Sequence, residues 1–119
     1  MRQGAVYDSL GGLCLVAQVP FASGWWDRAR GLLGRPPLKS GQGLLISPCR
    51  SIHTFGMRYP IDVVFLDATG TVSKVVPNLQ PARFCGSMTA SDALELPASE
   101  ASRINLVAGR RLLWREGST

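Results

Sequence analysis

The sequence predicts a small, mainly β domain (α+β) with one amphipathic helix packed on it. Short β-prone runs such as residues 61–67, IDVVFLD, recur along the chain between turn-forming segments. The chain has 13 Gly and 8 Pro in 119 residues, which indicates many short elements joined by tight loops. Strands do not alternate with long helices, so a doubly wound parallel sheet is disfavoured. We expect about six or seven short, mostly antiparallel strands in a barrel or sandwich, forming a single domain over residues 1–119.

The first third of the chain is expected to hold one strand and the helix. Residues 1–10 show no period, so we expect them to be frayed and flexible. Residues 13–19, LCLVAQV, form a short apolar run typical of a strand that is buried on both faces or ends in a core. Ser23 is a candidate N-cap for the helix that follows, and Gly34 with the next two prolines would end it. The residues that recur on one helical face, and that we expect in the core, are Trp25, Trp26, Ala29, Leu32 and Leu33.

The rest of the chain is expected to be mostly strand. The β-prone run at 61–67 ends in the turn DATG and is followed by a second run at 71–79, so residues 61–77 are expected to form a β-hairpin. Residues 98–109 have room for one or two helical turns. The other predicted strands are the short runs at 44–47, 51–55, 93–97 and 110–116.

Charge and cysteine content restrict the class of protein. The net charge is +5, and eleven of the thirteen basic residues are Arg, which suits contacts with phosphate or carboxylate groups. The arginines are spread along the chain without a nucleic-acid-binding motif, so nucleic acid is not the expected partner. The cysteines, three in number and without paired spacing, indicate free thiols in a reducing compartment. No apolar stretch is long enough to span a bilayer, so we expect a cytoplasmic protein.

The stretch with the most chemistry is residues 49–67, CRSIHTFGMRYPIDVVFLD, which contains the only histidine, His53. Cys49 and His53 have C-x3-H spacing. A structural zinc site needs four N or S ligands, and the chain has no second histidine and no C-x2-C pair. Signatures of phosphate-binding loops, dinucleotide sites and zinc proteases are also missing from the sequence. We therefore expect no metal site and no cofactor.

Asp62 interrupts an apolar strand, where a carboxylate is costly unless it is paired or hydrogen-bonded. The partners available to it in the sequence are His53, Arg50, Arg58 and Arg83. Strand alternation leaves two arrangements open. In the one that we favour, positions 61, 63 and 65 face the core and Asp62 lies beside solvent; in the other, Asp62 itself faces the core.

A catalytic alternative uses His53 as a general base for Cys49 or Ser51. Ser51 and His53 would share one face of an extended segment, and the neighbouring Arg50 would lower the thiol pKa of Cys49. No nucleophile elbow such as G-x-S-x-G surrounds Ser51. A hydrolase or transferase is therefore the second hypothesis, and we assign no catalytic residue.

Several motifs resemble those of the family called domain of unknown function 192. They are G-L-L-G-R at 31–35, H-T-x-x-M-x-x-P-I-D-V-x-F-L-D at 53–67 and L-E-L at 94–96, within a similarity that covers residues 25–115. The matching positions are Gly31, Leu32, Gly34, Arg35, His53, Met57, Pro60, Asp62, Phe65, Asp67, Glu95 and Leu96. The resemblance implies a compact, mostly β domain of bacteria and archaea, and it implies no reaction. The chain departs from the family pattern at Phe55-Gly56-Met57, where many members have Trp-Met, and at Gly109-Arg110, where members often have Gly-Asp.

Our leading hypothesis is a non-catalytic module that binds a small ligand or a protein partner. The predicted ligand-binding residues are His53, Met57, Arg58, Asp62 and Arg35. They form a polar loop and strand, with a helix end nearby, on an otherwise apolar β scaffold, and binding sites are common on such loops. A third hypothesis is a basic binder of anions or nucleic acid.

Overall fold

The computed structural model describes residues 1–117 and shows ten strands and two short helices in them. The elements are β1 (Gly4–Asp8), β2 (Cys14–Val16), β3 (Phe21–Ala22), α1 (Trp25–Arg30), β4 (Leu44–Ile46), β5 (Ser51–His53), β6 (Ile61–Leu66), β7 (Val72–Leu79), β8 (Phe84–Gly86), β9 (Asp92–Pro97), α2 (Glu100–Arg103) and β10 (Leu112–Glu116). The predicted mostly β fold is confirmed. There are more strands than we expected because several have only two or three residues. Neither helix has the length and apolar composition needed to cross a membrane.

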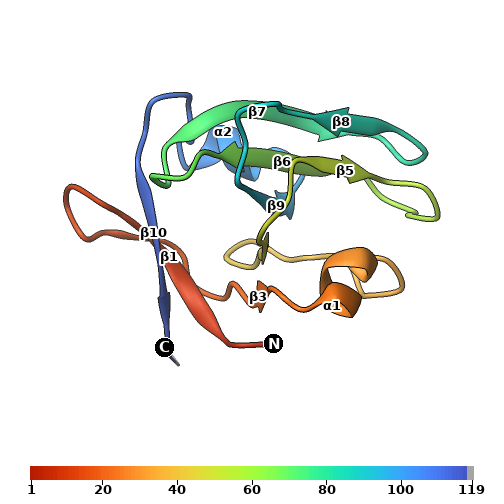
Figure 1. Ribbon diagram of the computed structural model, residues 1–119, viewed down its shortest axis with the longest axis horizontal. Coiled ribbons are helices and arrows are strands. Elements are labelled where there is room, and N and C mark those ends of the chain that lie inside the picture. Colours follow the sequence, from red (N-terminus) through yellow and green to blue (C-terminus); the bar gives the residue numbers. More distant parts are fainter. Residues whose placement is uncertain (118–119) are drawn as a thin grey trace.

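A five-stranded sheet of order β3-β4-β9-β6-β7 forms the centre of the molecule. Only the β3–β4 pair in it is parallel. A second sheet has the order β10-β1-β2, and β5 pairs with β8. In Figure 1, β6, β7 and β9 form an upper layer, and β1, β3 and α1 lie below it. This arrangement fits the predicted sandwich. No barrel closes within residues 1–117, so the barrel alternative is not confirmed.

The middle of the central sheet is buried on both faces: every residue of β6 is buried, and so are the four inner residues of β9. Positions 64, 66, 94 and 96 of β6 and β9 belong to one apolar cluster, which also contains residues of β1, β2 and β10. Positions 61, 63, 65 and 93 belong to a second cluster, which also contains Leu32 and Ile52. We call these the first and second clusters. By strand alternation, Asp62 lies on the face of the first cluster and Glu95 on the face of the second.

The N-terminal segment differs from its prediction. Residues Gly4–Asp8, which we expected to be frayed, form β1 and pair with β10 at the other end of the chain. Since the partner strand is so distant in the sequence, no local pattern predicts β1. The predicted strand at 13–19 is shorter than expected. Only Val16, at the end of β2, is fully buried and belongs to the first cluster, so the structure shows the alternative in which the strand ends in the core.

Helix α1 is the element whose packing we predicted least well. Trp25 and Trp26 are 74% and 66% exposed, so the expectation that they lie in the core is wrong. Gly24 is the N-cap and Ser23 does not cap the helix. The helix ends at Arg30, so the apolar face that we drew through residues 25–33 is interrupted and only its later part, at Leu32, is buried.

Candidate functional site

Buried polar atoms without a hydrogen-bond partner gather on one side of the second cluster. Within the part of the chain that the structure describes, these atoms are Arg28 Nε, Tyr59 Oη and Glu95 Oε1. Burial raises the pKa of Tyr59, and the charge of Glu95 raises it further, so the two side chains are close enough to interact. Nearly all buried polar groups in proteins are paired, so these three atoms mark this region as a candidate site.

Glu95 lies in the middle of the central sheet. It is in register with Leu44 of β4 on one side and with Val63 of β6 on the other, and it is only 2% exposed. Burial raises the pKa of its carboxyl from 4.5 to about 8 because the ionised form loses its hydration. At neutral pH the group is therefore mostly a carboxylic acid, which donates a hydrogen bond as well as accepting one.

Gly31 leaves space in front of this carboxyl. The residue caps the C-terminus of α1 with φ 53° and ψ −128°. A Cβ at this position would lie 3.5 Å from Glu95 Oε1 and 3.8 Å from Ile46 Cδ1. Arg35 Nε donates a hydrogen bond of 2.9 Å to the Gly31 carbonyl and so fixes the turn. The glycine and its arginine brace thus keep the approach to Glu95 open.

The space is a cavity of about 140 Å³, which we call the Glu95 pocket. It is bounded by the end of α1, by β4, by β5 with the loops on either side, and by Glu95 on β9. Its lining residues include Arg28, Arg30, Gly31, Leu32, Ile46, Cys49, Ile52, His53, Phe55, Met57 and Glu95. Apolar walls with a few polar groups are typical of small-molecule sites.

Most of the predicted site residues lie around this pocket. His53 and Met57 line it directly. The His53 ring is exposed on β5 and stacks on Phe55, with 5.6 Å between the ring centroids. Arg58 and Arg35 line a neighbouring, more open concavity of about 550 Å³, which also includes Met57. The structure therefore brings these four residues to one face of the molecule.

Asp62 lies apart from them, and our expectation that it faces solvent is wrong. It is fully buried on the face of the first cluster. Its Oδ1 accepts a hydrogen bond of 2.8 Å from the backbone N–H of Asn78, and its Oδ2 accepts one of 2.9 Å from that of Ala101. These bonds replace the predicted partners among His53 and the arginines, because the strand alternation turns Asp62 toward α2. The carboxylate braces a β7 residue with φ 51° and the first turn of α2.

The thiols are not arranged for nucleophilic attack. Cys49 Sγ donates a hydrogen bond of 3.1 Å to the Ser51 carbonyl, and burial raises the pKa of the Cys49 thiol. The expected lowering of that pKa by Arg50 is thus not observed. No hydrogen bond joins His53 to Cys49 or Ser51 in residues 1–117. Over the same range, no group of three or more His, Cys, Asp or Glu side chains is placed to hold a metal ion.

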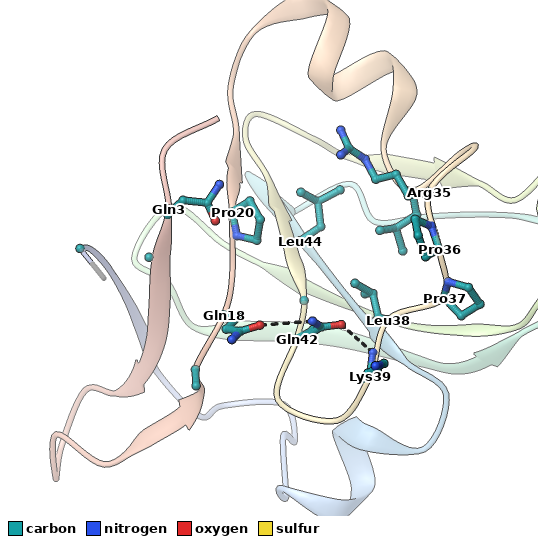
Figure 2. Close-up of a pocket in the computed structure, with 15 residues that line it drawn as sticks. Gln3, Gln18, Pro20, Arg35, Pro36, Pro37, Leu38, Lys39, Gln42 and Leu44 are labelled. Atoms are coloured by element: carbon teal, nitrogen blue, oxygen red, sulfur yellow. Dashed lines mark hydrogen bonds between the residues drawn. The ribbon is translucent and has the colours of Figure 1, made fainter. Parts of the chain in front are cut away.

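A larger groove of about 610 Å³ adjoins the Glu95 pocket and the 550 Å³ concavity, shares Leu32 and Arg35 with the latter, and includes Pro36, Pro37 and Leu38 (Figure 2). Two of its polar side chains are paired with each other. Gln42 donates a hydrogen bond of 3.2 Å to Gln18 Oε1 and accepts one of 2.8 Å from the Lys39 backbone. None of the unpartnered buried atoms belongs to a residue that lines this groove, so it offers a ligand fewer unpaired polar groups than the Glu95 pocket does.

The chain matches one known protein family and shares its fold with solved structures. The model of DUF192, described as "Uncharacterized ACR", matches residues 8–114. The chain belongs to the DUF192 family. This confirms the resemblance predicted from the sequence. A comparison with curated proteins finds no match.

Two solved structures share the fold of this DUF192 chain. One is a "putative transcription regulator" from Sinorhizobium meliloti 1021, with a TM-score of 0.83, 21% identity, and coverage of 96% of this chain and 94% of that one. The other is a protein of unknown function from Novosphingobium aromaticivorans DSM 12444, with a TM-score of 0.79, 18% identity, and coverage of 94% and 84%. At these identities the similarity shows the fold alone.

Glu95 is the central residue of the candidate site in this DUF192 chain, and the sequence alone assigns it no role beyond its place in the L-E-L motif. The signal was available, because Glu95 interrupts an apolar strand as Asp62 does. Arg28, Gly31 and Tyr59 carry no such signal, since their grouping depends on how α1 and the loop before β6 pack together.

Proposed function

We propose that this DUF192 domain is a non-catalytic binding module whose Glu95 pocket takes a small molecule. The observation that carries the proposal is the Glu95 carboxyl, which is buried, unpartnered and faces a space kept open by Gly31. A buried polar group left unpaired costs about 1–3 kcal/mol, and a ligand that pairs with it recovers part of that cost. The volume of about 140 Å³ is close to that of an engineered cavity of about 150 Å³ that holds benzene. The expected ligand thus has about six heavy atoms.

The predicted residues at the rim fit this role. His53 and Met57 line the pocket, and Arg58 and Arg35 lie beside it. The Cys49 thiol stays protonated at neutral pH because burial raises its pKa, and its hydrogen bond points to a backbone carbonyl rather than to His53. These contacts favour binding over covalent catalysis.

A fragment screen followed by NMR tests the proposal. Neutral, cationic and anionic fragments of fewer than about ten heavy atoms are added to the labelled protein. A ligand of the pocket should shift the amide resonances of Gly31 and Glu95 and saturate. The blocking variant is Ala29→Leu, because Ala29 is an exposed helix residue at the pocket wall. The matched control is Ala108→Leu, on an exposed turn elsewhere.

The proposal predicts fragments that bind the wild type and Ala108→Leu but not Ala29→Leu. It is wrong if no fragment shifts the Gly31 and Glu95 resonances, or if every such fragment binds all three proteins equally. Thermal unfolding of the variants is measured in parallel, so that lost binding is not confused with lost folding.

A further inference from the structure

Each of the two side chains with an unpartnered atom in the Glu95 pocket can donate a hydrogen bond at neutral pH. Arg28 Nε–H can only donate, and the Nη1 of the same guanidinium already donates to the Pro48 carbonyl at 3.2 Å. Glu95 carries a proton because burial raises its pKa to about 8. A ligand with two acceptor oxygens can therefore pair with both groups.

The charge inside the pocket agrees with this chemistry. Two arginines, Arg28 and Arg30, line it, and Glu95 is the only acidic residue in its lining. With Glu95 protonated, the lining carries a net positive charge. An ammonium ligand would meet these arginines, whereas an anion would be attracted to them.

The remaining walls are apolar. Leu32, Ile46 and Met57 contribute side chains from the end of α1, from β4 and from the loop before β6. A short alkyl chain fits these walls and the volume of about 140 Å³. A ligand that consists only of an inorganic anion would leave them in contact with water.

We propose that the Glu95 pocket binds a small carboxylate of about six heavy atoms. One carboxylate oxygen accepts from Arg28 Nε, the other accepts from protonated Glu95, and the alkyl chain lies against Leu32, Ile46 and Met57. The inference rests on the proposed function and names the class of ligand for it. Charge-assisted hydrogen bonds of this kind are the stronger ones in proteins.

This arrangement makes binding depend on pH. The titratable and charged groups that face Glu95 are Arg28 and Arg30 of α1, Cys49 before β5, His53 in β5, Tyr59 before β6 and Cys85 in β8. Once Glu95 ionises, its negative charge repels the ligand and its donor is lost. If only the protonated form binds, a pKa of about 8 makes the affinity fall about tenfold between pH 7 and pH 9. Replacing Glu95 by Gln keeps the other groups, so it isolates this effect.

The experiment uses butyrate, butyramide and butylamine as probes of matched shape and different charge. Binding is followed by the amide resonances of Gly31 and Glu95 at pH 7 and pH 9, in the wild type and three variants. Glu95→Gln keeps a donor and removes the titration. Arg28→Gln removes the cationic donor, and Arg83→Gln, on an exposed loop, is the control for the change in net charge.

Butyrate should bind the wild type and Arg83→Gln in preference to the other two probes. Its affinity should fall about tenfold at pH 9 in the wild type, stay constant in Glu95→Gln, and drop about tenfold in Arg28→Gln. Saturable binding of butyramide or butylamine in place of butyrate would overturn the carboxylate inference and leave the pocket function standing. If butyrate binds the wild type equally well at both pH values, the carboxylate does not accept a hydrogen bond from protonated Glu95, and that part of the inference is overturned. Failure of every probe at both pH values also overturns it, and the fragment screen decides separately whether the pocket binds anything.

Discussion

Two carboxylates interrupt the apolar strands of the central sheet, and their surroundings differ. Asp62 on β6 accepts two backbone hydrogen bonds, from Asn78 and Ala101. Glu95 on the adjacent β9 is as deeply buried, but its Oε1 has no partner. Since a buried charge without partners is costly, Glu95 holds a proton, whereas both oxygens of Asp62 accept from backbone N–H groups. Asp62 thus braces the fold, and the unpartnered carboxyl of Glu95 is the group on which the proposed binding rests.

Glu95 should make the stability of the protein fall as pH rises. Its folded pKa of about 8 lies above the ordinary value of 4.5, so the folded state binds the proton more tightly than the unfolded state. The contribution to stability is therefore full below about pH 4.5 and is lost as pH rises to about 8. Between about pH 5.5 and pH 8 we expect the free energy of unfolding to fall by about 3 kcal/mol. Urea unfolding at several pH values measures this.

The Glu95→Gln variant is the control for that prediction. Its amide has the shape of the protonated acid and does not titrate, so its stability should stay nearly constant over the same range. The variant should thus be more stable than the wild type at pH 8. Parallel pH profiles for the two proteins would contradict the assigned pKa of Glu95.

Replacing Asp62 should lower the free energy of unfolding by the same amount at every pH near neutral, in contrast to the pH-dependent effect of Glu95. Asp62→Ala leaves the N–H groups of Asn78 and Ala101 without their acceptors, and we expect a loss of about 3 kcal/mol. Asp62→Asn keeps one acceptor oxygen and should lose less. The comparison is Glu116→Ala, since Glu116 pairs with Arg2 at 3.4 Å on the exposed surface and should cost under about 1 kcal/mol. If urea unfolding gives equal losses in the free energy of unfolding for Asp62→Ala and Glu116→Ala, the hydrogen bonds of Asp62 do not stabilise the fold as we infer.

At the scale of elements, the tryptophan on β10 is packed against its neighbours, whereas the two tryptophans on α1 are exposed. Trp114 on β10 donates a hydrogen bond of 2.8 Å to the Val19 carbonyl, and its ring lies 4.8 Å from that of Phe21. It also packs so closely over Gly4 that a Cβ there would lie 2.5 Å from the indole. Trp25 and Trp26 on α1 instead lie mostly in solvent. Strand β10 is therefore held by packing, and the start of α1 is not.

Alanine substitutions should separate the two elements. Trp114→Ala removes a ring, a hydrogen bond and the contact with Gly4, and should cost about 3 kcal/mol. Trp25→Ala and Trp26→Ala should each cost under about 1 kcal/mol, as is usual for exposed positions. Thermal or urea unfolding measures all three. A loss for Trp25→Ala that matches the loss for Trp114→Ala would mean that α1 packs against the sheets more closely than the structure shows.

At the scale of the whole molecule, local patterns predicted the elements and missed their long-range partners. The hairpin of β6 and β7 follows from two β-prone runs and the DATG turn, and the structure contains it. By contrast, β1 pairs with β10 at the far end of the chain, and the helix that was expected to bury Trp25 leaves it exposed. The candidate site shows the same difference between local and long-range information. His53 and Met57 were predicted from a motif within one segment, whereas Glu95 lies beside them only because of the order of strands in the sheet.

The shared central sheet should make the molecule unfold as one unit. Each face of β6 and β9 forms part of a different apolar cluster, so unfolding of one cluster removes a wall of the other.

Trp114 packs against the first cluster, and the thiols of Cys49 and Cys85 pack against the second. In a Cys14→Ser variant with both α1 tryptophans changed to Phe, Trp114 fluorescence and the reactivity of the two remaining thiols report on the clusters separately. Their urea midpoints should coincide with each other and with far-UV circular dichroism. Thiols that react at clearly lower urea than the Trp114 transition would show that the layer around the Glu95 pocket opens on its own. The sheet would then not couple the two clusters.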